Sequence, residues 1–104
     1  MSDVVVYVAL GGNFPETRNL FERTLEELKR LGTEIEISPI YQTKPVSSIP
    51  QSDFLNACVK FKTKLGLLPL FQCLEEIEVH LGKVKKSKEA PRPIDLDLLF
   101  YGEE

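Results

Sequence analysis

The apolar residues of this 104-residue chain follow two different spacings, and the two alternate along its length. Four segments are apolar throughout or at every second position, which is typical of β-strands. Two segments between them place leucine and isoleucine three or four positions apart, as in a helix with one buried face. The predicted strands cover residues 4–10, 33–41, 54–63 and 94–101, and the predicted helices cover residues 14–31 and 69–81.

The resulting order, β-α-β-β-α-β, predicts an α+β fold of the ferredoxin-like kind, a four-stranded antiparallel sheet with two helices on one face. A chain of this length is expected to form a single domain, residues 1–104. The apolar positions of the last two strands define the face that the helices cover, and they are Leu55, Ala57, Val59, Phe61, Leu96, Leu98 and Phe100. Asn56, Asp95 and Asp97 are therefore expected on the uncovered face, where a ligand has access.

Charge and composition exclude several classes of partner. Thirteen Lys and Arg residues against sixteen Asp and Glu give a net charge of −3, so we expect no nucleic acid and no membrane as partner. No apolar run approaches the roughly 18 residues of a membrane span, and the N-terminus lacks the pattern of a secretion signal. Cys58 and Cys73 lack the spacing of a zinc or redox motif and are predicted to be reduced thiols. These features favour a cytoplasmic location.

Asp95 and Asp97 are the strongest indication of chemistry. Side chains two positions apart on a strand project from the same face, about 7 Å apart. Two carboxylates at that distance repel each other unless a cation lies beside them. Oxygen ligands favour a hard ion such as Mg²⁺, which keeps other positions for water and phosphate. A strand at the edge of the sheet with two solvated acids has the same pattern, so the pair alone leaves both interpretations open.

A basic loop directly before the last strand favours the first interpretation. It contains Lys83, Lys85, Lys86, Lys88 and Arg92. Cations beside a metal-binding acid pair suit a polyphosphate, because they neutralise the charge that moves to the leaving group. A solvated loop is also rich in lysine, but the two features together favour a nucleotide or another phosphate ligand.

Other polar residues carry weaker signals. Asn56, close to Phe54, has an amide whose donor and acceptor suit the edge of a flat heterocycle, and a hydrogen bond to a neighbouring loop is the alternative. Asn13 is expected to cap the first helix with its side chain. Helical spacing places Glu75 and Glu78 away from the apolar stripe, so both are expected in solvent.

The segment KEAPRPIDLDLL, residues 88–99, resembles the signature of the 6-hydroxymethyl-7,8-dihydropterin pyrophosphokinase family of folate biosynthesis. The segments YVALGGN (7–13), SPIYQTKP (38–45) and FLNA (54–57) are also similar to that family, so the resemblance extends over nearly the whole chain. It implies the ferredoxin-like fold. It also implies transfer of pyrophosphate from ATP to the hydroxymethyl group of 6-hydroxymethyl-7,8-dihydropterin, giving AMP and the pterin diphosphate.

The same resemblance implies roles for individual residues. Two Mg²⁺ ions on the triphosphate are expected at Asp95 and Asp97. Residues expected in catalysis are Lys83, Lys85, Arg92, Asp95 and Asp97. Residues expected to bind ATP are Glu75, Glu78, Lys85, Arg92 and Leu98. Residues expected to bind the pterin are Thr43, Pro45, Val46, Phe54 and Asn56.

The chain departs from the family pattern in three ways. The residue before Ala90, often aromatic in the family, is Glu89 here. The family often has arginine where this chain has Lys83 and Lys85, and lysine lacks the planar guanidinium that binds phosphate through two nitrogens. Family members also continue past the last strand, so the domain is expected to be short at its C-terminal end, as in a fragment or a fusion with another folate-pathway enzyme. The alternative function is a catalytically incomplete ferredoxin-like domain for nucleotide or metal binding, or for interaction.

Overall fold

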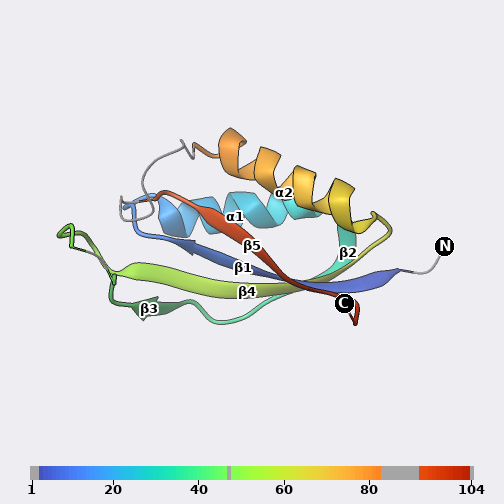
Figure 1. The fold of residues 1–104 in the computed structure, drawn as a ribbon, viewed down its shortest axis with the longest axis horizontal. Helices are drawn as coiled ribbons and strands as arrows, with labels where there is room; N and C mark the ends of the chain where they lie inside the picture. Colours follow the sequence, from blue (N-terminus) through green and yellow to red (C-terminus); the bar gives the residue numbers. More distant parts are fainter. Residues whose placement is uncertain (1–2, 47, 83–91, 104) are drawn as a thin grey trace.

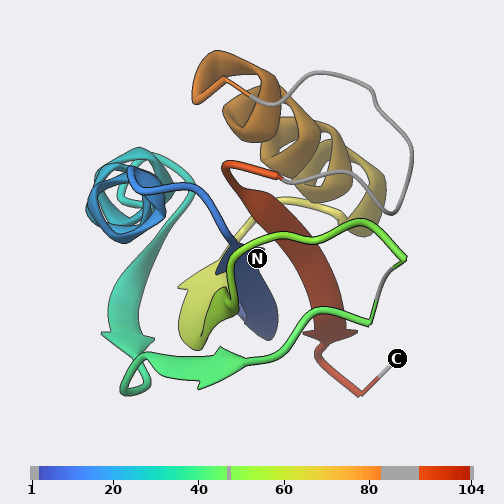
Figure 2. The same ribbon diagram turned by 90° about the vertical axis from the view of Figure 1, so that its left-hand side faces the viewer.

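The computed structural model describes residues 3–46, 48–82 and 92–103, which form a layer of strands and a layer of helices (Figure 1). In chain order the elements are β1 (Val4–Gly12), α1 (Thr17–Leu28), β2 (Gly32–Ile37), β3 (Tyr41–Thr43), β4 (Phe54–Thr63), α2 (Leu67–His80) and β5 (Asp95–Tyr101). Both helices lie on the same face of the sheet, which Figure 2 shows from the end. The predicted ferredoxin-like α+β fold is therefore confirmed.

The sheet is antiparallel and has one strand more than predicted. Its order is β2-β4-β1-β5, and the short strand β3 pairs with the first residues of β4. The strand predicted at residues 33–41 is thus two strands, because β2 pairs with residues 59–63 and β3 with residues 54–56. Pro39 lies between the two strands and has no N–H to continue the ladder.

The core lies between the sheet and the two helices. The alternation predicted for β4 is confirmed, because Ala57, Val59 and Phe61 are buried and Lys60 is exposed. The apolar faces of the two helices supply the other side of the core. Other core side chains include Val6, Val8 and Leu10 of β1, Leu20, Phe21 and Leu28 of α1, and Leu70, Leu74 and Ile77 of α2.

The last strand departs from strict alternation at Leu99. Its register with β1 shifts between Tyr7 and Val8, so Leu99 is an additional residue in β5. A bulge of this kind moves the following side chains to the opposite face. Phe100 is accordingly 58% exposed and meets the ring of Tyr7 edge-on at 6.1 Å, whereas Tyr101 packs against the core. The prediction that Phe100 faces the helices is therefore wrong.

The first helix begins later than predicted. It starts at Thr17, and its N-cap residue Glu16 makes no side-chain capping bond within the described part of the chain. The predicted cap by Asn13 is wrong, because the Asn13 side chain binds residues far away in the sequence. The helices that the structure describes are all too short or too polar to cross a membrane.

Candidate active site

Several of the described residues that are predicted to carry chemistry lie at one end of the sheet. The turn after β1, the loop between β3 and β4 and the start of β5 meet there (Figures 1 and 2). Gly11 of β1 pairs with Asn56 on one side and with Asp95 on the other. Directly paired residues project from the same face, so Asn56 and Asp95 flank Gly11 at two strand spacings, about 10 Å apart. Glycine leaves the surface between them without a side chain.

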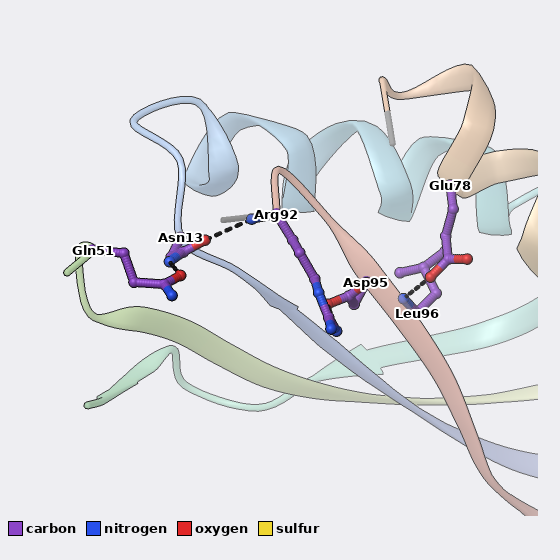
Figure 3. Close-up of polar contacts among 6 residues, drawn as sticks. All are labelled: Asn13, Gln51, Glu78, Arg92, Asp95 and Leu96. Atoms are coloured by element: carbon purple, nitrogen blue, oxygen red, sulfur yellow. Dashed lines mark hydrogen bonds and ion pairs between the residues drawn. The ribbon is translucent and has the colours of Figure 1, made fainter. Parts of the chain in front are cut away.

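The two aspartates project from the uncovered face, as predicted. Asp97 lies opposite Ala9, one row further along β5 than the pair of Asp95 and Gly11, and the intervening Leu96 is buried. Asp97 is exposed, whereas the side chain of Asp95 is only 15% exposed. The guanidinium of Arg92 lies 3.1 Å from Asp95 Oδ2 (Figure 3). This cation compensates part of the negative charge that two neighbouring carboxylates would otherwise concentrate.

The donor set at this position fits magnesium bound together with a phosphate ligand. Among the described residues, no group of three or more Asp, Glu, His or Cys side chains is arranged to hold a metal ion. Mg²⁺ in nucleotide sites commonly takes one or two carboxylates and completes its shell with water and phosphate oxygens. A pair of aspartates on an accessible face therefore suits an ion that arrives with a nucleotide.

The pairing of β3 with β4 brings together three of the five residues expected to bind the pterin. Thr43 lies opposite Phe54, and the amide nitrogen of Asn56 donates a hydrogen bond to the Thr43 hydroxyl at 2.9 Å. The amide oxygen of Asn56 faces the other way, 3.6 Å from where a Cβ atom would lie on Gly11. The amide of Asn56 thus hydrogen-bonds to the last residue of the neighbouring strand β3, while its oxygen faces the surface over Gly11. Pro45 and Val46, the other two residues, follow in the loop, and Val46 is fully exposed.

Three residues expected to bind ATP line a single cavity of about 290 Å³ between α2 and β5. They are Glu75, Glu78 and Leu98, and Asp97 lines the same cavity. Glu75 is exposed as predicted, but Glu78 is only 8% exposed. The expectation of a solvated Glu78 is therefore wrong, because its carboxylate accepts a hydrogen bond from the backbone N–H of Leu96 at 2.6 Å (Figure 3).

The outer edge of β5 forms part of this cavity. β5 is an edge strand, and the N–H of Leu96 points outward to Glu78 instead of to β1. Backbone groups two residues apart in an antiparallel strand point the same way, so Leu98 directs its N–H and C=O to the same edge. The cavity wall therefore offers a neighbouring donor and acceptor from one residue.

Asn13 is the site residue that sequence reasoning missed. Its Oδ1 accepts a hydrogen bond from the Arg92 N–H at 2.8 Å (Figure 3). Its Nδ2 donates to Gln51 Oε1 at 2.6 Å and to the Ser52 carbonyl at 3.1 Å. The sequence offered a polar residue directly after two glycines at a strand end, a signal that equally suits a helix cap.

Arg92 is the one member of the basic loop that the structure describes. Lys83 and Lys85, predicted as catalytic residues, lie outside the described residues, as do Lys86 and Lys88. The arginine is held beside Asp95 by both its backbone and its guanidinium. At the start of β5, the described residues thus place one cation, Arg92, beside the two carboxylates of Asp95 and Asp97.

Fold and site together define a ferredoxin-like α+β domain with an arginine-flanked acid pair at one end of its sheet. Residues 7–103 match the family model of 7,8-dihydro-6-hydroxymethylpterin-pyrophosphokinase (HPPK). The chain belongs to this family.

Curated relatives agree with this assignment. The chain is 36% identical over 101 residues to 2-amino-4-hydroxy-6-hydroxymethyldihydropteridine pyrophosphokinase of Pseudomonas aeruginosa, covering 95% of this chain and 62% of that protein. It is 32% identical to the protein of the same name from Bacillus subtilis, covering 96% and 61%. It is 42% identical to the mitochondrial folate synthesis bifunctional protein of Arabidopsis thaliana, covering 93% and 18%. The chain thus spans about three fifths of those two bacterial relatives and a smaller part of the bifunctional protein.

Proposed function

We propose that this chain transfers the pyrophosphoryl group of ATP to 6-hydroxymethyl-7,8-dihydropterin in folate biosynthesis. The observation that carries the proposal is the row formed by Asn56, Gly11 and Asp95, with Asp97 and the cavity between α2 and β5 beside it. A flat ring lying along that row and a triphosphate at the acid pair would meet next to Asp95. The names of the relatives support the same activity.

The pterin is proposed to lie over Gly11. The absent side chain lets a flat ring approach the backbone of β1, and Asn56 Oδ1 faces that space as an acceptor for ring N–H groups. Phe54, which is partly exposed beside Thr43, supplies an aromatic surface for stacking. Pro45 and Val46 would close over the ring from the loop.

ATP is proposed to bind along the outer edge of β5. The adenine base presents a donor and an acceptor side by side, which complements the outward C=O and N–H of Leu98. Glu75 and Glu78 line the same cavity, and the triphosphate would continue past Asp97 to Asp95 and Arg92. Two magnesium ions held by the aspartates would neutralise phosphate charge and fix the orientation of the triphosphate.

The reaction then requires one substitution at phosphorus. The hydroxymethyl oxygen attacks the β-phosphorus and loses its proton to water, while the bond between that phosphorus and the α,β-bridging oxygen breaks. AMP leaves with the bridging oxygen, and the pterin retains the β- and γ-phosphates. Arg92 compensates the charge that develops on the phosphates. Lys83 and Lys85 are proposed to assist in the same way.

The proposal also covers the setting of the protein. Small molecules as substrates suit a cytoplasmic enzyme, and some relatives are bifunctional folate-synthesis proteins. A fused or adjacent folate-pathway enzyme is therefore part of the proposal.

Calorimetric titration with α,β-methylene-ATP, which cannot be cleaved between the α- and β-phosphates, tests the proposal. Asp97→Asn should weaken Mg²⁺-dependent binding by about tenfold or more, whereas Asp3→Asn, at the opposite end of β1, should leave it unchanged. AMP release from ATP in the presence of the pterin then tests turnover. Mg²⁺-dependent binding without AMP release would support the alternative of a binding domain, and binding that ignores Mg²⁺ would overturn the acid pair as a metal site.

A further inference from the structure

We infer that Asn13 is a positioning residue that couples the loop between β3 and β4 to Arg92, and through Arg92 to Asp95. The inference goes beyond the proposed function and rests on it only for the identity of the two ligands. Its basis is one side chain, 6% exposed, that contacts both segments at the same time.

The backbone of Arg92 is held from both sides by Asn13. The Asn13 side chain accepts from the Arg92 N–H at 2.8 Å, and the Asn13 N–H donates to the Arg92 carbonyl at 2.8 Å. These two bonds fix the point from which the arginine side chain starts. The guanidinium then lies 3.1 Å from Asp95 Oδ2.

The amide nitrogen of the same side chain binds the loop that precedes β4. Both hydrogens of Nδ2 are used, one for Gln51 Oε1 and one for the Ser52 carbonyl. Reversing the amide would set Nδ2 against the Arg92 N–H and Oδ1 against the Ser52 carbonyl, so the surroundings select one orientation. A displacement of the loop by a ligand at Phe54 is therefore transmitted to Arg92.

The turn around Asn13 is built to hold the segment before β5. A Cβ atom on Gly12 would lie 2.3 Å from the Pro93 carbonyl oxygen, so only glycine permits this approach. The hydroxyl of the buried Thr17 donates to the same carbonyl at 2.7 Å. Residues 12, 13 and 17 thus fix residues 92 and 93, and the connection to the loop has a rigid base.

Amide hydrogen exchange in the unliganded protein tests the coupling directly. Gln51→Ala should accelerate exchange of the Arg92 amide by about threefold or more, and should add nothing once Asn13 is replaced by alanine. Asn13→Asp keeps an acceptor for the Arg92 N–H but loses the donors to Gln51 and Ser52, so Gln51→Ala should no longer change exchange of the Arg92 amide in that background. Gln72→Ala, an exposed amide of α2, is the matched control. The inference would be overturned if Gln51→Ala left exchange of the Arg92 amide unchanged, or accelerated it equally in the wild type and in Asn13→Ala.

Paired ligand titrations supply a readout that a purely structural role would leave unchanged. The Kd of 6-hydroxymethylpterin is measured with and without Mg²⁺ and α,β-methylene-ATP. The Kd without the nucleotide, divided by the Kd with it, should be about five or more in the wild type and within about twofold of one in Asn13→Ala. An unchanged ratio in the variant, or a ratio of one in the wild type, would overturn the coupling. A wild type that binds neither ligand would overturn the proposed function instead, and hydrogen exchange alone would then decide the inference.

Discussion

The carboxylate of Glu78 accepts a hydrogen bond from the backbone N–H of Leu96 at 2.6 Å, which joins α2 to the outer edge of β5. Glu78→Ala removes the acceptor from a buried position and should lower the free energy of unfolding by about 1–3 kcal/mol. Glu78→Gln keeps an oxygen there and should cost less. Urea denaturation measures both, with the exposed Glu76→Ala as control at about 0.5 kcal/mol or less. An alanine variant as stable as the wild type would contradict the structural role of this bond.

Gly12 and its neighbour Gly11 should respond differently to alanine. A Cβ atom on Gly12 meets the Pro93 carbonyl at 2.3 Å, whereas one on Gly11 has its nearest neighbour at an ordinary 3.6 Å. Gly12→Ala should therefore lower the free energy of unfolding by about 1–3 kcal/mol, because β1 and the segment before β5 must separate. Gly11→Ala, in the same strand, is the control and should cost less. Thermal and urea unfolding of the two variants make the comparison, and equal losses would refute the close approach at Gly12.

A larger side chain at Gly11 should affect the pterin and not the nucleotide. Gly11→Leu extends apolar atoms over the row between Asn56 and Asp95 on the uncovered face, so the fold is expected to persist. The affinity for 6-hydroxymethylpterin should fall about tenfold or more, while the affinity for Mg²⁺ and α,β-methylene-ATP should stay within about threefold. Calorimetry on both ligands measures this split. Undiminished pterin affinity would show that the ring lies elsewhere.

The bulge at Leu99 makes opposite predictions for the two residues that follow it. Tyr101 packs against the core and donates its hydroxyl hydrogen to the Leu65 carbonyl at 2.7 Å, so Tyr101→Ala should cost about 2–4 kcal/mol of unfolding free energy. Phe100→Ala loses chiefly the edge-on contact with Tyr7 and should cost about 1 kcal/mol. Strict alternation along β5 predicts the reverse order, so chemical denaturation of the two variants distinguishes the registers.

Much of the fold could be predicted because its periodic segments are long. The alternation from Leu55 to Phe61 and the helical stripe of Leu70, Leu74 and Ile77 each identify one buried face. The bulge could not be predicted, because Leu99 and Phe100 are both apolar and a shift of one position leaves no trace in the pattern. Pro39 was a visible signal for the break between β2 and β3, but the apolar residues on both sides suggested continuity.

The site could be predicted only as far as it depends on strand geometry. Asp95 and Asp97 share the uncovered face because their spacing matches the period of a strand. The role of Asn13 depends on partners 38 and 79 residues away, Gln51 and Arg92, and no local pattern specifies such contacts. Glu78 lies beside the apolar stripe of α2, and the need for an acceptor there arises only when the helix packs on an edge strand.

One additional residue allows the seven-residue strand β5 to present the two aspartates on the uncovered face and Tyr101 on the core face. Before Leu99, the odd-numbered side chains lie on the uncovered face of the sheet and the even-numbered ones on the helix-covered face, and after Leu99 this assignment is reversed. A regular strand that carries the Asp-Leu-Asp segment would therefore need its buried aromatic residue at position 100 instead of position 101. Without the bulge, strict alternation over the same seven residues would project Asp95, Asp97 and Tyr101 from the same face, so either the aspartates or Tyr101 would leave their present face.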